Sequence, residues 1–204
     1  GRSFYQRSVR ILEDLKEAEA STTQAHGELL GSLKVALPLS FGQLHLAPAI
    51  EDFLRLHPRI EFDLDFNDRQ VDLIQEGFDL AIRIADLEDS SLIAKKIAPI
   101  RQTVCASPAY IDRHGQPSRP EQLIDHHCLA YSLLPDYRVW TFNSTDGDEI
   151  RVTIRPKLKA SVGEFLKDLA VDGHGIVMVP SFIAYRAIET GDLIPLMVDY
   201  SIPG

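Results

Sequence analysis

Residues 31–66, GSLKVALPLSFGQLHLAPAIEDFLRLHPRIEFDLDF, contain two strand patterns with a helix pattern between them. Apolar residues alternate over residues 33–37, which predicts a strand that stops at Pro38. After LSFG the apolar spacing changes to that of one helix face, and His57-Pro58 ends the helix. Strict alternation returns in IEFDLDF, with acidic residues on one face, which is typical of a strand near a sheet edge. A strand, a helix and a strand in this order favour a parallel sheet with crossover helices.

Strands and helices continue to alternate through the rest of the chain. Asn67 or Asp68 is predicted to cap a short helix that Gly77 closes, and a strand follows over residues 79–84. Ser107 is predicted to cap one later helix, and Ser161 with Glu164 is predicted to form a capping box on another. Further strands are predicted over residues 104–106, 127–131, 140–142, 150–154, 158–160 and 175–179. Asp146-Gly147 predicts a hairpin turn. A last helix is predicted to begin at Pro180-Ser181 and to end at Gly191, and LIPLMV begins a further element.

One strand of this series carries a charge that needs a partner. DLAIRIADL, residues 79–87, has the apolar run of a strand buried on both faces, yet Arg83 lies inside it. A lone buried guanidinium is energetically unfavourable. Because Arg83 lies at the carboxyl end of its strand, it can point into a crevice and meet an anion or water there. A structural ion pair with Asp68 or Asp86 is the alternative interpretation.

Composition limits the classes of function. A chain of 204 residues that is 45% hydrophobic and 25% charged can bury the cores of two small α/β lobes. Its net charge of −9 repels phosphate backbones, so we expect any DNA binding to lie elsewhere. Cys105 and Cys128 are too few for a disulfide framework, and the sequence shows no leader and no apolar run of membrane length. We therefore expect a cytoplasmic protein that does not bind membranes.

The first residues predict a long amphipathic helix. Over residues 4–29 apolar residues recur at alternating spacings of four and three, which is the pattern of a coiled-coil seam. Gly27 and Gly31 end this helix before the globular pattern begins. The helix either packs on its own domain or, as we favour, pairs with a partner. The predicted dimerisation residues are Phe4, Ile11, Leu15 and Ala18.

Polar residues lie at the junctions where predicted strands end and helices begin. In an open parallel sheet such junctions lie along the carboxyl edge, where helix N-termini offer unpaired N–H groups and positive partial charge. This edge should prefer a small molecule that bears a carboxylate or other acceptors. Any single one of these residues could instead simply cap its helix. The prediction of a ligand site therefore depends on several junctions lying close together in the fold. The junction residues are Ser40, Asn67, Asp68, Ser107, Ser161 and Ser181.

Three segments carry a resemblance to a known family. GSLKVALPLSFGQLHLAPAIEDFLRLHP, DFNDRQVDLIQEGFDLAIRIADLEDSSLIAKKIAP and CASPAYIDRHG resemble, in this order, the effector-binding region of LysR-type transcriptional regulators. The resemblance implies an α/β fold of two Rossmann-like lobes of the type II periplasmic-binding-protein kind, preceded by a long linker helix that dimerises. It also implies an effector between the lobes, and a winged helix-turn-helix that this chain does not contain and through which alone DNA would be bound.

The resemblance further implies a division of the chain and a site. The linker helix would cover residues 1–28, the first lobe residues 31–103 with residues 193–204 returning to it, and the second lobe residues 104–192. The implied partners are a small effector, with carboxylates as candidates, and further copies of the chain in a homodimer or tetramer. Carried over residue by residue, the effector site comprises Leu39, Ser40, Phe41, Asn67, Asp68, Arg83, Ile84, Ser107, Tyr131, Ser161, Val162 and Pro180.

The sequence gives no positive sign of other chemistry. Cys105 and Cys128 lie in apolar strand patterns and are expected to be buried structural residues, with a redox pair as the alternative. His126, His127 and Cys128 are consecutive, but neighbouring strand residues point to opposite faces and no second ligand pair follows. The sequence contains no P-loop, nucleophile elbow, zinc-protease motif or complete dinucleotide fingerprint. We therefore expect no metal, no cofactor and no catalytic residues.

Three classes of function remain open. The favoured one is the ligand-sensing, dimerising region of a bacterial transcriptional regulator, in which an effector biases the arrangement of lobes or subunits. A two-lobe solute-binding protein shares the architecture but gives no reason for a leading coiled-coil helix. A small α/β enzyme would need a base or nucleophile with a partner, which the sequence does not show.

Overall fold

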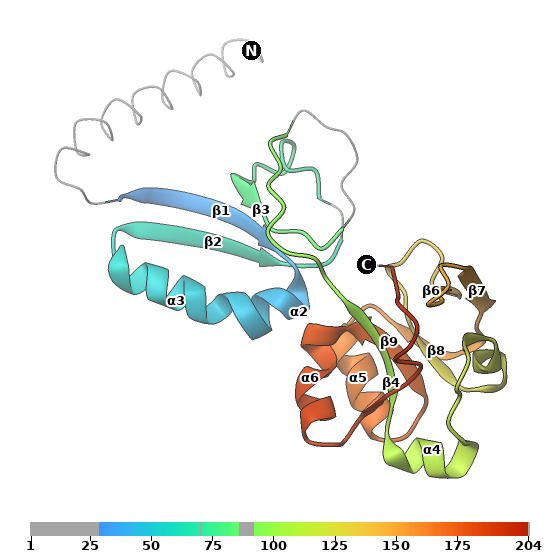
Figure 1. The fold of residues 1–204 in the computed structure, drawn as a ribbon. Coiled ribbons are helices and arrows are strands. Elements are labelled where there is room, and N and C mark those ends of the chain that lie inside the picture. The colour runs from blue at the N-terminus through green and yellow to red at the C-terminus, as the bar shows by residue number, and fades with distance from the viewer. Residues whose placement is uncertain (1–28, 70, 86–91, 204) are drawn as a thin grey trace. The chain divides into compact units, whose positions relative to one another are not determined.

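A computed structural model describes residues 29–69, 71–85 and 92–203 of the chain (Figure 1). The chain divides into two compact units, residues 1–83 and residues 84–204. This division falls ahead of the lobe boundary that the sequence led us to expect between residues 103 and 104. The predicted dimerisation residues Phe4, Ile11, Leu15 and Ala18 lie outside the described residues.

The first unit contains a small parallel sheet with a helix on one face (Figure 1). Strands β1 (Gly31–Leu37), β2 (Ile60–Phe66) and β3 (Leu80–Ala81) lie in the order β2-β1-β3, and both pairs are parallel. Between β1 and β2 the chain forms α2 (Leu39–Phe41), the π-helical turn η2 (Gly42–Leu46) and α3 (Ala47–Leu56). Phe53 of α3 packs edge-on against Phe62 of β2, with ring centroids 5.8 Å apart. The predicted strand–helix–strand unit is present, with β2 at the sheet edge.

The helix after β1 begins earlier than the sequence predicted. Its first residue is Leu39, directly after Pro38, instead of a residue beyond LSFG. Ser40 therefore lies within the first helical turn, where it is buried at 6% exposure, and does not act as the N-cap. Proline sets an extended backbone at position 38 and cannot itself donate a hydrogen bond, so the helix starts immediately after it.

The short helix predicted after β2 does not form. A single hydrogen-bonded turn occupies residues 73–77, and its capping side chain is Asp72, not Asn67 or Asp68. The Asp72 carboxylate accepts from the backbone N–H of Ile74 and of Gln75, at 3.1 and 3.0 Å. Gly77 does close the turn as predicted, with φ at +69°.

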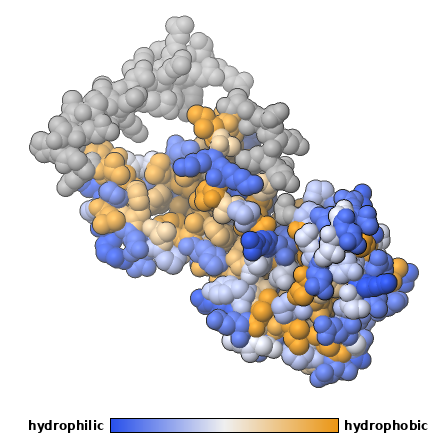
Figure 2. All heavy atoms as spheres, viewed as in Figure 1, coloured by the Kyte–Doolittle hydropathy of each residue, from blue (hydrophilic) through white to orange (hydrophobic). Residues whose placement is uncertain are grey.

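Strand β3 is an exposed edge strand and not the doubly buried strand that the apolar run suggested. Only Leu80 and Ala81 are assigned to it, and the Leu80 side chain is 51% exposed. The apolar run was misleading because a two-residue strand at the edge of a sheet has little to pack against. Figure 2 shows that apolar side chains cover much of the visible surface of this first unit.

The second unit contains a five-stranded mixed sheet. Its strands lie in the order β10-β4-β9-β5-β8, with bounds of Ile194–Pro195 for β10, Gln102–Ala106 for β4, Ile176–Pro180 for β9, Cys128–Tyr131 for β5 and Pro156–Ala160 for β8. Strands β8, β5 and β9 are mutually parallel, but β4 is antiparallel to β9 and β10 is antiparallel to β4. The sheet is therefore mixed at β4 and β10, where the alternation of strands and helices had favoured parallel strands. Strand β10 also lies in this sheet, whereas we had expected residues 193–204 to return to the first lobe.

Helices and a hairpin cover the two faces of this sheet. The helical segments are α4 (Pro108–His114), the 3-10 segment η3 (Pro120–Asp125), α5 (Gly163–Val171) and α6 (Ser181–Glu189), and strands β6 (Val139–Asn143) and β7 (Glu149–Thr153) form the predicted hairpin. One core cluster contains Trp140 and Phe142 of the hairpin, and the other contains Leu166 of α5. Cys105 and Cys128 are fully buried in these clusters. Among the described residues, no helix combines the length and apolar character needed to cross a membrane.

Candidate functional site

The three strand ends of the first unit meet at one sheet edge. Leu37 of β1 is in register with Phe66 of β2, and Ala36 is in register with Ala81 of β3. Because all three strands are parallel, their carboxyl ends lie along the same edge. The structure therefore brings together the first-unit residues predicted for the site, which are Leu39, Ser40, Phe41, Asn67, Asp68 and Arg83.

Hydrogen bonds link these junctions to one another. The Asp68 carboxylate accepts from the backbone N–H of Leu39 at 2.9 Å, so the segment after β2 satisfies a helix N–H after β1. The Arg83 guanidinium donates through Nη1 to the backbone carbonyl of Arg69 at 3.0 Å. This second bond fixes the residue after β3 to the segment that follows β2.

Two polar side chains at this edge carry buried atoms without a hydrogen-bond partner. In the part of the chain that the structure describes, neither the Oδ1 nor the Nδ2 atom of Asn67 has a partner, and neither does Nη2 of Arg83. Buried polar atoms are usually hydrogen-bonded, since leaving one unpaired costs about 1–3 kcal/mol. An amide and a guanidinium together offer donors that match a carboxylate or another oxygen-rich group.

The charges around Arg83 decide what it can bind. Burial lowers the pKa of Arg83, and the neighbouring Arg69 lowers it further, while Asp68 and Asp65 act in the opposite direction. Arg69 itself is held by Glu76 through two hydrogen bonds of 2.8 and 2.6 Å. Because Arg69 binds Glu76, the partly buried Arg83 keeps donors for an anion. A bound anion would favour the charged form of Arg83, which burial disfavours.

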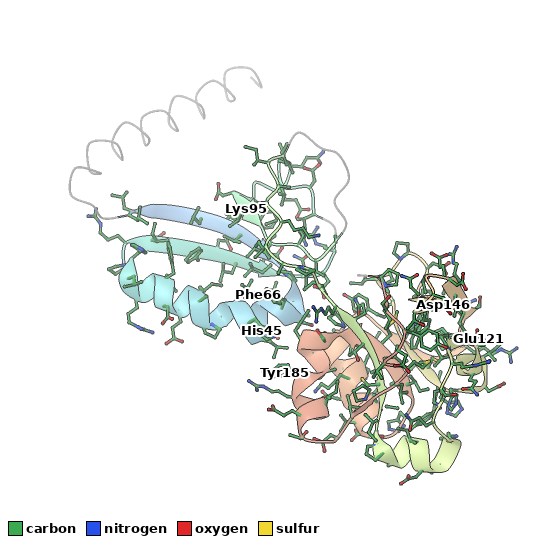
Figure 3. All side chains as sticks on the ribbon, in the orientation of Figure 1. His45, Phe66, Lys95, Glu121, Asp146 and Tyr185 are labelled. Atoms are coloured by element: carbon green, nitrogen blue, oxygen red, sulfur yellow. The ribbon has the colours of Figure 1, made fainter. Side chains whose placement is uncertain are left out.

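A close contact shapes the inner wall of this edge. A Cβ atom on Gly42 would lie 2.7 Å from Cε1 of Phe66 and 3.3 Å from Cβ of Leu37. Figure 3 labels Phe66 near the carboxyl end of β2 and His45 on the helical segment that faces it. Only glycine allows the helical segment to approach the ends of β1 and β2 this closely.

The second unit has its own carboxyl edge. Strands β5, β8 and β9 are parallel, with Tyr131 in register with Ala160, and Pro180 ends β9. The predicted residues Tyr131, Ser161, Val162 and Pro180 therefore follow or end three neighbouring strands at one edge. Ile84, where the second unit begins, is 38% exposed and directly follows Arg83.

Two helices start at this second edge without a side-chain cap. Val162 is the N-cap of α5 and Pro180 is the N-cap of α6, and neither makes a side-chain capping bond. The predicted capping box of Ser161 and Glu164 is therefore wrong, because the helix begins one residue later than that box requires. The N-termini of two helices therefore place partial positive charge at this edge, although the first N–H of α6, that of Ser181, already donates to a backbone carbonyl.

Ser107 does not lie at this edge. Register pairs Cys105 with Val177 and Gln102 with Pro180, so the carboxyl end of β4 points to the opposite end of β9. Ser107 caps α4 there, as predicted, with its hydroxyl accepting from the N–H of Tyr110 at 3.4 Å. The sequence placed Ser107 in the site because a strand's direction cannot be deduced from its apolar pattern.

The antiparallel direction of β4 brings other residues to the edge. Gln102 lies in register with Pro180, and the backbone carbonyl of Arg101 accepts from the N–H of Ser181 at 2.8 Å. These two residues at the start of β4 take the place that we had predicted for Ser107. The sequence held no signal for them, since they precede an element whose direction was unknown.

The histidines and cysteines near β5 are engaged within the fold. Tyr110 Oη lies 3.1 Å from Nδ1 of His126 and accepts from the backbone N–H of His127 at 3.0 Å. Burial raises the pKa of Cys105 and Cys128 to about 12, so both are neutral thiols at physiological pH. Within the described ranges, no group of His, Cys, Asp and Glu residues has the arrangement of a metal site.

Comparisons with known proteins agree with this fold. Residues 26–203 match the family model described as the LysR substrate binding domain. An uncharacterised HTH-type transcriptional regulator of Haemophilus influenzae is 38% identical over 98% of this chain, and the HTH-type transcriptional regulator CrgA of Neisseria meningitidis serogroup B is 33% identical over 98%. The chain spans 69% and 66% of the lengths of these two relatives.

A solved structure has the same architecture. The regulatory domain of CrgA, described as a LysR-type transcriptional regulator from Neisseria meningitidis, superposes with a TM-score of 0.74 at 32% identity. The match covers 85% of this chain and 84% of that domain. The fold is therefore the mixed α/β fold of such regulatory domains, which is of the type II periplasmic-binding-protein kind.

Proposed function

The chain belongs to the LysR substrate-binding family and contains the effector-binding region of a LysR-type transcriptional regulator, and from this premise we propose that it binds a small anionic effector. In this proposal the carboxyl edges of the two units contact the same bound molecule. A carboxylate is the favoured chemical group because both edges present donors and positive partial charge.

The main support for this proposal comes from the unpaired polar atoms of Asn67 and Arg83. Both belong to the first carboxyl edge, and both have buried polar atoms that lack a partner among the described residues. A bound carboxylate could accept from Nη2 of Arg83 and from Nδ2 of Asn67, which would satisfy the unpaired donors. The hydrogen bond from Arg83 to the Arg69 carbonyl would hold the guanidinium in place for that contact.

The second edge supports the same class of ligand. The N-termini of α5 and α6 lack side-chain caps and would attract negative charge. Tyr131 adds a half-buried aromatic ring at the end of β5, which suits an effector with an apolar or aromatic body. We no longer include Ser107 in the proposed site, because β4 carries it to the opposite edge.

A thermal-shift screen tests this proposal. Each carboxylate in the panel is paired with the amide of the same skeleton, since a ligand at a hundred times its dissociation constant adds about 2.7 kcal/mol of stability. We expect one or more carboxylates to raise the melting temperature while their amides do not. Arg83→Ala should remove that shift, whereas the matched control Arg55→Ala changes an exposed arginine on α3 and should keep it. A ligand that stabilises wild type and Arg83→Ala equally would show that Arg83 is not part of the site.

We also propose that residues 1–28 pair with another copy of the chain, since their predicted seam is that of a dimerising linker helix. In the whole regulator, DNA would be bound by an N-terminal winged helix-turn-helix, and the protein would act in the cytoplasm with the chromosome. Sedimentation of residues 1–204 and of residues 29–204 tests the pairing. The longer chain should sediment as a dimer or tetramer, and equal monomers would contradict the proposal.

The alternative of a two-lobe solute-binding protein has less support. Both curated relatives named above are HTH-type transcriptional regulators, and they match over 98% of this chain. No observation in the described residues favours transport of a solute over sensing of an effector.

A further inference from the structure

Two side chains at the carboxyl edge of the first unit leave both kinds of hydrogen-bonding atom unpaired. Nδ2 of Asn67 and Nη2 of Arg83 are donors and Oδ1 of Asn67 is an acceptor, and none of these buried atoms has a partner among the residues that the structure describes. The carboxylate proposed above would satisfy the two donors. It cannot satisfy the acceptor, because an ionised carboxylate has no hydrogen to donate. The Oδ1 atom of Asn67 therefore requires a second group on the ligand.

This requirement does not depend on which way the Asn67 amide is turned. The oxygen and the nitrogen of an amide exchange places when the group is flipped. Within the described ranges both atoms are buried and lack a partner, so either orientation presents one donor and one acceptor side by side. A ligand that satisfies this amide must itself offer an acceptor and a donor close together.

The Arg83 guanidinium reaches the segment that contains this amide. Asn67 directly follows Phe66, which Figure 3 labels at the end of β2, and its N–H donates to the carbonyl of Leu37 in β1 at 3.0 Å. Arg83 follows β3, which lies on the other side of β1, but its Nη1 donates at 3.0 Å to the carbonyl of Arg69, two residues after Asn67. The Arg83 side chain therefore crosses the end of β1 toward the segment after β2.

A hydroxyl fits the unpaired acceptor better than an ammonium does. A hydroxyl donates one hydrogen bond, and Oδ1 of Asn67 can accept it. An ammonium has three hydrogens, so pairing one of them with Oδ1 leaves two more that need acceptors. It would also lie near the like charge of Arg83, which a neutral hydroxyl does not oppose.

From these observations we propose that the effector is a 2-hydroxy carboxylic acid, an inference that rests on the proposed anionic effector and names its chemical class. The carboxylate accepts from Nη2 of Arg83 and from Nδ2 of Asn67, and the 2-hydroxyl donates to Oδ1 of Asn67. The hydroxyl and the carboxylate stand on adjacent carbons, so one end of the ligand can pair with both atoms of the amide. This arrangement leaves none of the three protein atoms unpaired.

An acid without the hydroxyl, accompanied by a bound water, is the competing arrangement. A water molecule can donate to Oδ1 of Asn67 as a hydroxyl does, and ordered water often satisfies buried polar atoms. The two arrangements predict different affinities. If the hydroxyl makes the bond, its removal from the ligand weakens binding, whereas a water that makes the bond is unaffected by that removal.

Isothermal titration calorimetry with the full chain tests this proposal. The probes are lactate, malate, mandelate and 3-phenyllactate, which are 2-hydroxy acids with different bodies. Each is compared with the acid that lacks the hydroxyl (propionate, succinate, phenylacetate and 3-phenylpropionate) and with the corresponding 2-amino acid. The variants are Asn67→Ala and Arg83→Ala. The matched control is Asn143→Ala, which makes the same change at the end of β6 in the second unit.

We expect at least one 2-hydroxy acid to bind about tenfold more tightly than its deoxy partner in wild type and in Asn143→Ala. In Asn67→Ala the same pair should bind within about twofold of each other, because the hydroxyl has lost its acceptor. Arg83→Ala should weaken both members by a similar factor, since they share the carboxylate.

The Asn67 side chain should contribute to binding and not to folding. Its amide has no partner to lose among the described residues, so ligand-free Asn67→Ala should melt no lower than wild type. If Asn67→Ala fails to fold, Asn67→Leu replaces it, since leucine has similar size and no hydrogen-bonding atom. The comparison of the acid pairs then decides.

Two results would refute the 2-hydroxy acid and leave the anionic effector intact. Equal affinities for every hydroxy acid and its deoxy partner, with both lost in Arg83→Ala, would mean that the ligand does not pair with Oδ1 of Asn67. Tighter binding of a 2-amino acid would assign an ammonium to that place. If no carboxylate binds, either here or in the wider thermal-shift panel, the proposed anionic effector itself fails and the 2-hydroxy acid fails with it.

Discussion

The Asp68 carboxylate accepts a hydrogen bond of 2.9 Å from the backbone N–H of Leu39, so a residue after β2 caps the helix after β1. This bond replaces the cap that the sequence of that helix lacks, since Pro38 precedes it and makes no side-chain bond. It also holds two of the strand ends that form the first carboxyl edge.

Replacing Asp68 should therefore destabilise the first unit. We expect Asp68→Ala to lower the free energy of unfolding by about 1 kcal/mol, since that is a typical loss for a helix cap. Asp68→Asn keeps an acceptor oxygen but loses the charge, so it should cost less. Urea unfolding followed by circular dichroism measures both. Equal midpoints for wild type and Asp68→Ala would show that the Leu39 N–H needs no such acceptor.

The approach of η2 to the strand ends should make Gly42 sensitive to substitution. A Cβ atom there would lie 2.7 Å from the Phe66 ring, so we expect Gly42→Ala to cost about 1–3 kcal/mol. Phe66→Leu removes the ring edge and should recover part of that loss when it is combined with Gly42→Ala. Denaturant unfolding of the two single variants and the double variant checks this. Simple additivity of the two losses would contradict the contact.

The elements of this fold differ in how well the sequence predicts them. The strands β1 and β2 and the hairpin of β6 and β7 follow from alternating apolar residues and from the Asp146-Gly147 turn, where Gly147 has φ at +89°. These signals are local, so they predict local structure correctly. The family resemblance then supplied the two-lobe architecture that local signals could not.

The incorrect predictions for Asp68 and Ser107 concern features that a neighbouring element of the fold determines. Asp68 looks like the cap of a following helix, but its oxygen is used by Leu39 from an earlier segment, and the following residues form only one turn. Ser107 looks like part of a carboxyl edge, but β4 runs antiparallel to β9. Hydrophobic periodicity contains neither the direction of a strand nor the distant partner of a side chain.

The two cysteines should be unreactive in the folded protein. Burial raises the pKa of Cys105 and of Cys128 to about 12, and the thiolate is the reactive form. At pH 8 we expect less than one equivalent of either thiol to react with iodoacetamide over hours, and both to react within minutes in concentrated urea. Mass spectrometry of the modified chain reports this. Rapid labelling of Cys128 under native conditions would mean that its strand opens readily.

Tyr110 and His126 should make the second unit sensitive to mild acid. The N–H of His127 donates to the Tyr110 oxygen, which directs the hydroxyl proton to Nδ1 of His126 and favours the neutral imidazole. Burial lowers the pKa of His126, and His114 and His127 lower it further, whereas Asp125 opposes them.

A lowered histidine pKa gives a defined direction of pH dependence. The stabilisation is complete above the unfolded-state pKa of about 6.5 and is lost as the pH falls from there through the folded-state value. His126→Asn keeps an acceptor near the Nδ1 position but does not titrate. Melting temperatures between pH 8 and pH 5 should therefore fall more for wild type than for His126→Asn. Parallel curves would show that His126 does not titrate in this range.

If one effector contacts the carboxyl edges of both units, as we propose, its binding should slow amide hydrogen exchange in both. The compound with the largest thermal shift is added, and amide exchange of the whole chain is compared with and without it by mass spectrometry. We expect slower exchange in peptides that contain residues 39–41, 67–69, 131–132 and 161–163, and no change around Ser107, which lies at the opposite end of the second sheet. Protection confined to one unit, or centred on Ser107, would contradict the claim.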